Sequence, residues 1–333
     1  MNILAIIPAR SGSKTVKDKN IKLMAGKPML AYSIEHAIAS SLINRIIVST
    51  DSPKYADIAK EYGAEVPFLR PDEISQDLST DHEAFLHALN ELKQKEDYMP
   101  DIVVHLRPTY PIRDAEDIDK MITMLIENKD ADSVRSISYA NDNPFKMWTM
   151  CSDGQIKPLV SNIKDCYNMP RQYLPTAYYQ NACIDVVHGD VITDKMSMTG
   201  DNIMGYLMSK NFDIDTKEEF VAAESYLNIL QGSKTFCFDI DGVIALCRKD
   251  LDYSKTQPNE VIISIVNRLY DYGNEIILFT ARGFKTGIDW REVTKNQMKE
   301  WGVKHHMLML GKPSADYYID DHTMTIDTLL KLF

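Results

Sequence analysis

Short apolar runs alternate with amphipathic stretches along this chain, and no other feature of the sequence limits the fold as strongly. The runs that read as buried strands are Leu4–Ile7, Arg45–Ser49, Val66–Leu69, Ile102–Leu106, Ser133–Ile137 and Ala182–Val187. The stretches that read as helices are Pro28–Ser40, Lys54–Tyr62, His82–Gln94 and Ala115–Asn128, the last with Asp114 as its N-cap. Such alternation predicts a mainly parallel sheet with helices on both faces, and ligands of such sheets bind at the carboxyl ends of the strands.

A second folding unit is expected to begin after residue 232. Lys217–Leu230 reads as a helix that ends at Gly232, and Lys234–Phe238 reads as a new buried strand. A chain of 333 residues is long enough for two cores. We therefore expect two Rossmann-like, three-layer α/β domains over residues 1–232 and 233–333, with a junction short enough to indicate packed domains.

The composition excludes several classes of function. A net charge of −11 argues against nucleic acid and against an anionic membrane surface as partners. The first apolar run is too short to span a membrane and lacks the features of a signal peptide. The cysteines are odd in number, form no CxxC pair and are predicted to be reduced, mostly buried thiols: Cys151, Cys166, Cys183, Cys237 and Cys247. We therefore expect a cytoplasmic protein.

A cationic loop of small residues follows the first predicted strand. The loop is Ala9–Lys14, and between Met1 and Ile34 one acid, Asp18, stands against six basic residues: Arg10, Lys14, Lys17, Lys19, Lys22 and Lys27. Backbone N–H groups in such a loop cradle phosphate oxygens while Lys and Arg supply charge, so a nucleoside triphosphate is the expected ligand. No Gly-Lys-Ser/Thr triplet ends the loop, so it is not a P-loop. The alternative is an ordinary basic surface loop.

The first 230 residues carry an ordered series of motifs. They are Pro8–Lys14, Lys19–Ile21, Gly26–Leu30, Ile47–Asp51, Phe68–Pro71, Asp77, His87–Leu89, Arg171–Pro175 with Asn181, and Phe212–Thr216. In this order and spacing they resemble the acylneuraminate cytidylyltransferase family, whose members join CTP to an acidic sugar and release pyrophosphate. The resemblance implies a fold like that of nucleotide-diphospho-sugar transferases, a homo-oligomer (dimer or tetramer), and a role in the biosynthesis of capsule or lipopolysaccharide.

The resemblance also assigns the nucleotide site. Arg10 and Lys14 are expected at the β- and γ-phosphates, and Lys19 at the α-phosphate, where a point charge helps the transition state. Arg10 and Lys19 are therefore the expected catalytic residues of the first domain. The full set of expected nucleotide-binding residues is Arg10, Ser13, Lys14, Lys19, Asn20, Arg70 and Asp77.

Two carboxylates in the last of these motifs are candidates for a metal site. Asp213 and Asp215 are one residue apart and would point to the same face of an extended strand. Two carboxylates on one face suit Mg²⁺ bridged to phosphate. The alternative is that these residues cap the helix that begins at Lys217.

The acceptor site shows departures from the family pattern. The expected acceptor-binding residues are Arg107, Arg171, Gln172 and Asn181, although a surface ion pair is an alternative for Arg70 and for Arg171. Arg107 stands where the family usually has Gln, Asp81 where Ser is common, and Ala182 where Gly is usual. The added fixed cation at Arg107 indicates an acceptor with different or extra negative charge. A nonulosonic acid is the first choice, and another sugar acid or a small phosphate or phosphonate remains an alternative.

The second domain carries a different series of motifs. Phe238–Ile244, Ile276–Gly283, Gly311–Pro313 and Tyr318–Asp321 resemble, in this order, the haloacid-dehalogenase (HAD) phosphatase superfamily. Only a short segment, Leu246–Pro258, separates the first motif from the next predicted helix, so no large cap domain is expected. The active site should then be open or covered by a neighbouring subunit.

The second resemblance also assigns roles to individual residues. Asp239 would attack phosphorus, and Asp241 would protonate the leaving group and then activate water. Thr280 and Lys312 would hold the phosphoryl oxygens, while Asp239, Asp241 and Asp320 would hold Mg²⁺, with Asp321 in support. The alternatives are a turn at Asp241-Gly242 and a helix cap at Asp320-Asp321. His305 and His306 are interpreted as structural rather than metal-binding, and Met307–Leu310 as a buried strand.

Three hypotheses follow for the whole chain. The first is a bifunctional enzyme whose second domain dephosphorylates a phosphorylated precursor and whose first domain joins the product to CMP. The second is an active cytidylyltransferase whose HAD domain serves only for oligomerisation. The third is a regulatory nucleotide-binding module without turnover.

Overall fold

The computed structural model describes residues 1–12, 18–140, 142–208, 212–232, 234–246, 252–315, 317–318 and 320–333. The chain divides into two compact units, Met1–Ala223 and Glu224–Phe333. The division falls inside helix α6 (Lys217–Leu230), whereas the sequence pattern placed the domain boundary after this helix. Within the described ranges, no helix is long and apolar enough to cross a membrane.

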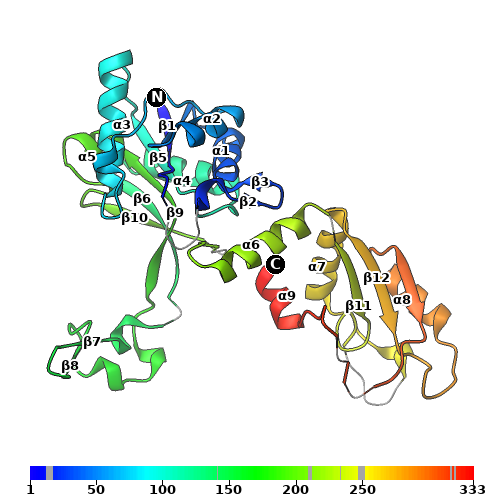
Figure 1. Ribbon diagram of the computed structural model, residues 1–333. Helices are drawn as coiled ribbons and strands as arrows, with labels where there is room; N and C mark the ends of the chain where they lie inside the picture. The colour runs from blue at the N-terminus through cyan, green and yellow to red at the C-terminus, as the bar shows by residue number, and fades with distance from the viewer. Residues whose placement is uncertain are drawn as a thin grey trace. The chain divides into compact units, whose positions relative to one another are not determined.

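A six-stranded sheet forms the centre of the first unit (Figure 1), with the strand order β10-β6-β9-β5-β1-β4. The strands are β1 (Ile3–Pro8), β4 (Arg45–Ser49), β5 (Ile102–Leu106), β6 (Ser133–Tyr139), β9 (Tyr178–His188) and β10 (Ile203–Leu207). Neighbouring strands are parallel except that β9 runs antiparallel to both β5 and β6. The prediction of a mainly parallel sheet is therefore confirmed, with one strand reversed.

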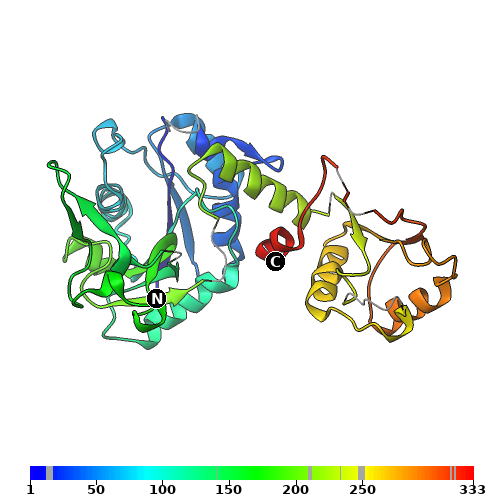
Figure 2. The same cartoon turned by 90° about the horizontal axis from the view of Figure 1, so that it is seen from below.

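Helices cover both faces of this sheet, as Figure 2 shows for α1 and α3. One face packs against α1 (Met29–Ala39), α2 (Pro53–Glu61) and α4 (Ala115–Glu127), and the other against α3 (Asp81–Glu96) and the short α5 (Gly189–Thr193). Successive side chains of a strand point to opposite faces, so Ala5 and Ile7 of β1 join the first core while Leu4 and Ile6 join the second. The unit thus has three layers.

Some expectations for individual elements were wrong. Val66–Leu69 is irregular rather than a strand; Pro67 has no N–H to donate to a ladder, and Phe68 packs with α3 instead. Asp114 does precede α4, but its side chain makes no capping hydrogen bond. The sequence also gave no indication of the small hairpin of β2 (Leu23–Met24) and β3 (Lys27–Pro28), which follows the 3₁₀ turn η1 (Lys19–Ile21).

An arm extends from the ends of β6 and β9 (Figure 1). It contains the antiparallel pair β7 (Trp148–Met150) and β8 (Ile156–Pro158). Three short 3₁₀ turns complete it: η3 (Pro144–Lys146), η4 (Cys166–Asn168) and η5 (Arg171–Tyr173). A further turn, η2 (Asp72–Ile74), lies outside the arm.

The second unit is built on a three-stranded parallel sheet, β11 (Thr235–Asp239), β12 (Glu275–Thr280) and β13 (Met307–Leu310). Its helices are α7 (Glu260–Asp271), α8 (Arg291–Glu300) and α9 (Ile326–Leu332), with a 3₁₀ turn η6 (Tyr253–Lys255). The core is formed by one face of α7 with β11 and β12. The prediction that β13 is buried was wrong: the strand is at the edge of the described sheet, and Met307 and Met309 are 47% and 42% exposed.

The described cysteines are all unpaired thiols, but only Cys166 and Cys183 are buried. Cys237 is exposed and Cys151 is half-buried, so the expectation of mostly buried thiols holds for two of the four. Cys247 lies outside the described residues.

Candidate active site

The loop after β1 is fixed at both of its described ends. The backbone N–H of Ser11 donates to the Asp51 carboxylate, 2.7 Å away, and Asp51 itself follows β4. The buried amide of Asn20 donates to the carbonyl of Arg10 over 3.0 Å, and Arg10 Nη1 pairs with Asp77 Oδ1 at 3.0 Å. Arg10, Asn20 and Asp77, three of the expected nucleotide-binding residues, are therefore neighbours. Ser13 and Lys14 lie outside the described residues.

Lys19 connects this loop to a segment nearly 200 residues later in the chain. Its Nζ donates to the carbonyl of Ile214 over 2.8 Å and pairs with Asp215 Oδ1 at 3.1 Å. The Lys19 side chain is only 12% exposed, whereas Asp215 is 72% exposed. The predicted α-phosphate lysine and the predicted metal carboxylates thus occupy one region of the first unit.

Asp213 and Asp215 are not used for helix capping. Helix α6 begins with a reciprocal pair in which Thr216 Oγ1 accepts from the backbone N–H of Glu219, and the Glu219 carboxylate accepts from those of Asp215 and Thr216. Burial raises the pKa of Asp213, and the negative charge of Asp215 raises it further. The two carboxylates therefore repel each other, and this donor set fits a hard divalent cation.

Arg70 is buried rather than paired at the surface. It is 6% exposed, and its Nε and Nη2 donate to the side chain and carbonyl of Ser49 at 3.1 and 2.6 Å. Burial lowers its pKa, which the negative charges of Asp51 and Asp81 partly restore. Arg70 therefore holds the end of β4 beside these two carboxylates, and the alternative of a surface ion pair was wrong for this residue.

Arg107, directly after β5, is held by two carboxylates. Its Nη1 donates to the carbonyl of Ala182 (2.8 Å) and to Asp185 Oδ2 (3.1 Å), and its Nη2 donates to Asp81 Oδ2 (2.9 Å). Asp185 also accepts from Arg135 Nε at 2.9 Å. Asp185 and Arg135 were not predicted as site residues, although each is the only charged residue of its predicted strand, and that pattern was the available signal.

The other expected acceptor residues are distributed differently. Asn181 is 1% exposed; its Nδ2 donates to Ser138 Oγ, and its Oδ1 accepts from the N–H of Cys183. Arg171 and Gln172 lie in η5 of the arm, where Arg171 lines a separate pocket of about 320 Å³ together with Tyr139. The structure thus places Asn181 one residue from the Ala182 carbonyl that binds Arg107, but Arg171 and Gln172 belong to a different region.

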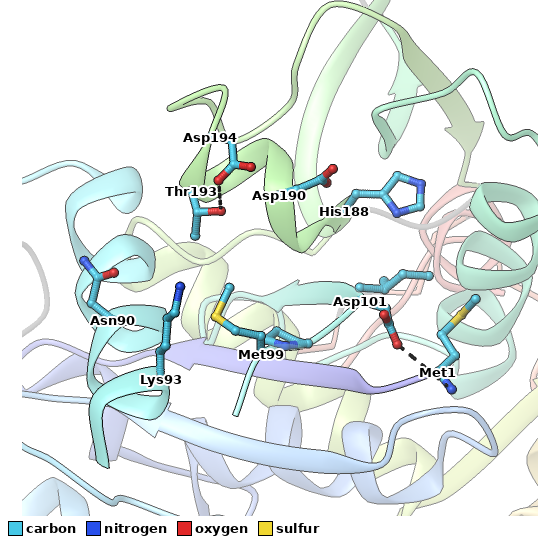
Figure 3. A pocket seen from close by; sticks show the side chains of 11 residues that line it. Met1, Asn90, Lys93, Met99, Asp101, His188, Asp190, Thr193 and Asp194 are labelled. Carbon is cyan, nitrogen blue, oxygen red and sulfur yellow. Dashed lines mark hydrogen bonds and ion pairs between the residues drawn. The ribbon is translucent and has the colours of Figure 1, made fainter. Parts of the chain in front are cut away.

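A larger pocket of about 860 Å³ lies at the edge of the same sheet where the parallel strands β1 and β5 begin (Figure 3). It is lined by residues around the start of β5 and the end of β9, including Asp101 and His188, and by Asn90 and Lys93 of α3. None of the predicted site residues lines it. Because ligands of mainly parallel sheets bind at the carboxyl ends of the strands, this pocket does not mark the candidate active site.

In the second unit, four predicted residues meet at the carboxyl edge of the sheet. Lys312 Nζ pairs with Asp239 Oδ2 at 2.6 Å, and Thr280 Oγ1 donates to Asp241 Oδ2 at 3.3 Å. Arg282, which the sequence analysis did not single out, is 3% exposed and donates from Nε and Nη2 to the Asp241 carboxylate at 2.9 and 2.8 Å. Its Nη1 is held in turn by Gln297.

The remaining predicted residues of the second unit lie in an exposed group. Asp320, Asp321 and His322 each offer a ligand atom within 4.8 Å of the others. Hydrogen bonds, first of all from the backbone N–H of His322, lower the pKa of Asp320. The pairing of Asp320 with Asp239 around a metal stays a prediction. His306 Nδ1 accepts from the N–H of Ile276, and its ring stacks on Tyr270.

Cationic side chains and paired carboxylates grouped on a mainly parallel α/β sheet are features of enzymes that act on nucleotides. Residues 4–149 match the family described as "Cytidylyltransferase". The CMP-N,N'-diacetyllegionaminic acid synthase of Legionella pneumophila is 34% identical over 240 residues, which cover 69% of this chain and 98% of that protein. The chain therefore belongs to the cytidylyltransferase family, and it is a nucleotidyltransferase.

Two further similarities agree with this assignment. The N-acylneuraminate cytidylyltransferase of Streptococcus agalactiae serotype V is 31% identical over 231 residues, covering 68% of this chain and 54% of that protein, so the chain spans about half of its length. A solved structure of CMP:2-keto-3-deoxy-manno-octonic acid synthetase in complex with CTP covers 68% of this chain and 98% of its own, with a TM-score of 0.53 and 14% identity. The first unit therefore has the α/β fold of nucleotide-diphospho-sugar transferases.

Proposed function

We propose that the first unit joins CTP to a nonulosonic acid, producing a CMP-sugar and pyrophosphate for a surface polysaccharide. The observation that carries this proposal is the contact of Lys19 with Ile214 and Asp215, because it brings the cationic loop region together with a pair of carboxylates. Family membership supports cytidylyl transfer, and the relatives named for legionaminic and neuraminic acids support the class of acceptor.

The proposed chemistry follows from the charges. An acceptor oxygen attacks the α-phosphorus of CTP, and the bond to the β-phosphate breaks. Arg10 holds the departing diphosphate, while Lys19 stabilises charge that develops at the α-phosphate. Asp213 and Asp215 would hold Mg²⁺, which supplies further counter-charge to the phosphates when bound. In this scheme Asn20 and Asp51 keep the loop in position.

Pyrophosphate release from CTP tests this proposal. The full chain is assayed with sialic, legionaminic and pseudaminic acids and with a small phosphonate. We expect release with at least one nonulosonic acid, and a Lys19→Met variant should lose about 10²-fold or more in kcat. Lys120→Met, an exposed lysine on α4, is the matched control. Pyrophosphate release with the phosphonate alone would favour the alternative acceptor class. If none of the acceptors supported pyrophosphate release, a binding module without turnover would be favoured.

For the second unit we propose a Mg²⁺-dependent phosphomonoesterase of the HAD type, acting on a phosphorylated precursor of the acceptor. The contact of Lys312 with Asp239 and the donation of Thr280 to Asp241 support it. Asp239 attacks phosphorus, forming an aspartyl-phosphate, while Asp241 gives its proton to the leaving alkoxide. Asp241 then takes a proton from the water that hydrolyses the intermediate. Asp239, Asp241 and Asp320 would hold the metal, which neutralises the phosphate.

Phosphate release from sugar-9-phosphates separates this proposal from its alternative. The wild type should release phosphate, Asp239→Asn should lose almost all of the activity, and Asp271→Asn, an exposed carboxylate paired with Lys304, should behave as wild type. Equal release by wild type and Asp239→Asn would contradict the phosphatase and favour a non-catalytic oligomerisation domain.

We also propose that the protein is a homo-oligomer, a dimer or a tetramer. The arm supports this, because it exposes a group of large apolar side chains: Met147, Trp148, Met150, Ile156 and Leu159. Sedimentation at several protein concentrations checks it. A Trp148→Ser, Met150→Ser variant should be more monomeric than the wild type, and a monomeric wild type would refute the proposal.

A further inference from the structure

A row of polar side chains crosses three neighbouring strands on the α3 side of the sheet. Asp185 of β9 lies opposite His105 of β5 and opposite Arg135 of β6 in the strand register. Asp185 is only 2% exposed, yet it accepts hydrogen bonds from both Arg107 and Arg135. One guanidinium is enough to compensate the charge of one buried carboxylate, so the second arginine calls for another explanation.

The two arginine side chains are less deeply buried than the carboxylate that they share. The side chains of Arg107 and Arg135 are 20% and 22% exposed. The Asp185 carboxylate accepts a hydrogen bond from each guanidinium, at 2.9 Å from Arg135 Nε and 3.1 Å from Arg107 Nη1. Within the described ranges, every hydrogen bond of Arg135 goes to Asp185. The pair therefore offers N–H groups at the surface in a fixed geometry.

Asp81 is the outer partner of Arg107. It is the first residue of α3, its side chain is 45% exposed, and its Oδ2 lies 2.9 Å from Arg107 Nη2. The four charges of Arg107, Arg135, Asp185 and Asp81 cancel, and the buried His105 is neutral because burial holds its pKa well below the usual range. Exposed ion pairs such as Arg107–Asp81 are weak and easily exchanged, whereas the contacts to buried Asp185 are not.

This cluster borders the candidate nucleotide site. Arg107 directly follows β5, which is the neighbour of β1, and Arg10 follows β1. Arg70 lies close enough to Asp81, Asp51 and Arg10 for all three charges to affect its pKa. A group bound at Arg107 is therefore adjacent to the loop that we expect to hold CTP.

We propose that Arg107 and Arg135 together bind the carboxylate of the acceptor, that Asp185 is the residue that positions both, and that the acceptor displaces Asp81 from Arg107. This inference rests on the proposed cytidylyl transfer to a sugar acid. A carboxylate carries one negative charge, so it replaces Asp81 charge for charge and the cluster stays neutral. A dianionic phosphate or phosphonate would leave an excess negative charge beside Asp185 and Asp81, so the arrangement selects sugar acids over such acceptors.

Calorimetric titration of the full chain tests this independently of turnover. The titrants are sialic, legionaminic and pseudaminic acids and their methyl esters, in the presence of CDP, which cannot react. Each acid that binds should bind about tenfold or more tightly than its ester, because the ester loses a charge-assisted hydrogen bond. Arg135→Gln should weaken acid binding by about tenfold or more. Asp81→Asn should strengthen it about two- to fivefold, because a weak exposed competitor is removed.

The controls keep folding and function apart. Asp97→Asn, at the other end of α3, should leave binding unchanged, since Asn tolerates the left-handed backbone of that residue. Arg135→Lys should restore only part of the affinity lost in Arg135→Gln, and the affinity for CDP should stay constant in all variants. Any of three results would overturn the inference. The first is equal binding of acid and ester, and the second is no binding of any acid. The third is that Asp81→Asn and Arg135→Gln both bind the acid as Asp97→Asn does. If carboxylate binding depended on Arg135 but no pyrophosphate were released, only the proposed transferase activity would be contradicted.

Discussion

At the scale of single residues, one charged side chain in each candidate site contacts two partners from another segment of the chain. Lys19 donates to both Ile214 and Asp215, and Asp241 receives both Thr280 and Arg282. In each case one side chain brings together segments that are distant in the sequence. Substitution of such a residue should therefore change the geometry of a site more than the stability of the fold.

Asp213 gives a prediction for metal dependence. Asp213→Asn removes one of two neighbouring carboxylates, so the Mg²⁺ concentration for half-maximal pyrophosphate release should rise by about tenfold or more. Glu218→Gln, an exposed acid in the first turn of α6, should leave it unchanged. Removal of Mg²⁺ with EDTA should abolish the release in both. An unchanged Mg²⁺ requirement in Asp213→Asn would contradict the proposed metal site.

Arg282 gives a prediction for the phosphatase. Its guanidinium donates to the Asp241 carboxylate from two nitrogens, so Arg282→Gln should misplace Asp241, the proposed general acid. With alkyl phosphates, whose leaving groups need a proton, kcat should fall by about 10²-fold with little change in KM. With p-nitrophenyl phosphate, whose leaving group needs none, the loss should be much smaller. Equal losses on both substrates would mean that Arg282 acts only on the structure.

At the scale of elements, the sequence predicted α1 to α4, α6 and most of the strands well, because their signals are local, whereas it gave no bounds for α5, α7, α8 or α9. Helix α6 was predicted with the bounds that it has, and α1 differs by a single residue at each end. Strand β4 was also predicted with its own bounds, but Val66–Leu69 was not a strand. A local apolar pattern cannot tell a strand from an extended loop that packs one aromatic side chain.

Helix α3 owes part of its stability to the capping box at its first turn. Thr80 Oγ1 accepts from the N–H of Glu83, and the Glu83 carboxylate accepts from the N–H of Thr80. Thr80→Ala should lower the free energy of unfolding by about 1 kcal/mol, and Thr80→Ser should keep it nearly unchanged. Urea denaturation followed by circular dichroism measures both variants; equal losses in the two would show that the hydroxyl is not responsible.

The candidate site was predictable only where its residues lie in motifs. The resemblance indicated Arg10, Lys19 and Asp215, and these lie in one region of the first unit. The contact between Asp185 and Arg135 could not be predicted, because these residues meet only through the antiparallel insertion of β9 between β5 and β6. That strand order depends on contacts between distant segments, which a single sequence does not display.

At the scale of the whole molecule, two histidines with lowered pKa values should make stability depend on pH. Burial, helped by the charges of Arg113 and Lys27, lowers the pKa of His36 to about 3 from 6.5. Between these values the unfolded chain binds a proton that the folded chain does not, so stability is complete above pH 6.5 and falls by about 1.4 kcal/mol per pH unit below it. Buried His105 acts in the same direction.

Urea denaturation of the full chain at pH 7.5, 6.0 and 5.0 checks this dependence. The free energy of unfolding should fall less steeply with decreasing pH in His36→Gln than in the wild type. His322→Gln replaces a histidine that is 88% exposed and should keep the wild-type slope. Parallel slopes for all three proteins would show that His36 titrates normally in the folded state.

The reversed strand β9 has a mechanical consequence. The ladder between β6 and β9 runs from Arg135 and Asp185 to Tyr139 and Tyr178, where the arm begins. The same two strands thus join the two ends, with an irregularity in their register between Arg135 and Ile137. A second copy that binds the arm would therefore also restrict the backbone beneath the acceptor residues. Dilution of the enzyme should therefore raise the KM for the sugar acid before it changes the KM for CTP, so that assembly itself would act as a regulator of substrate choice.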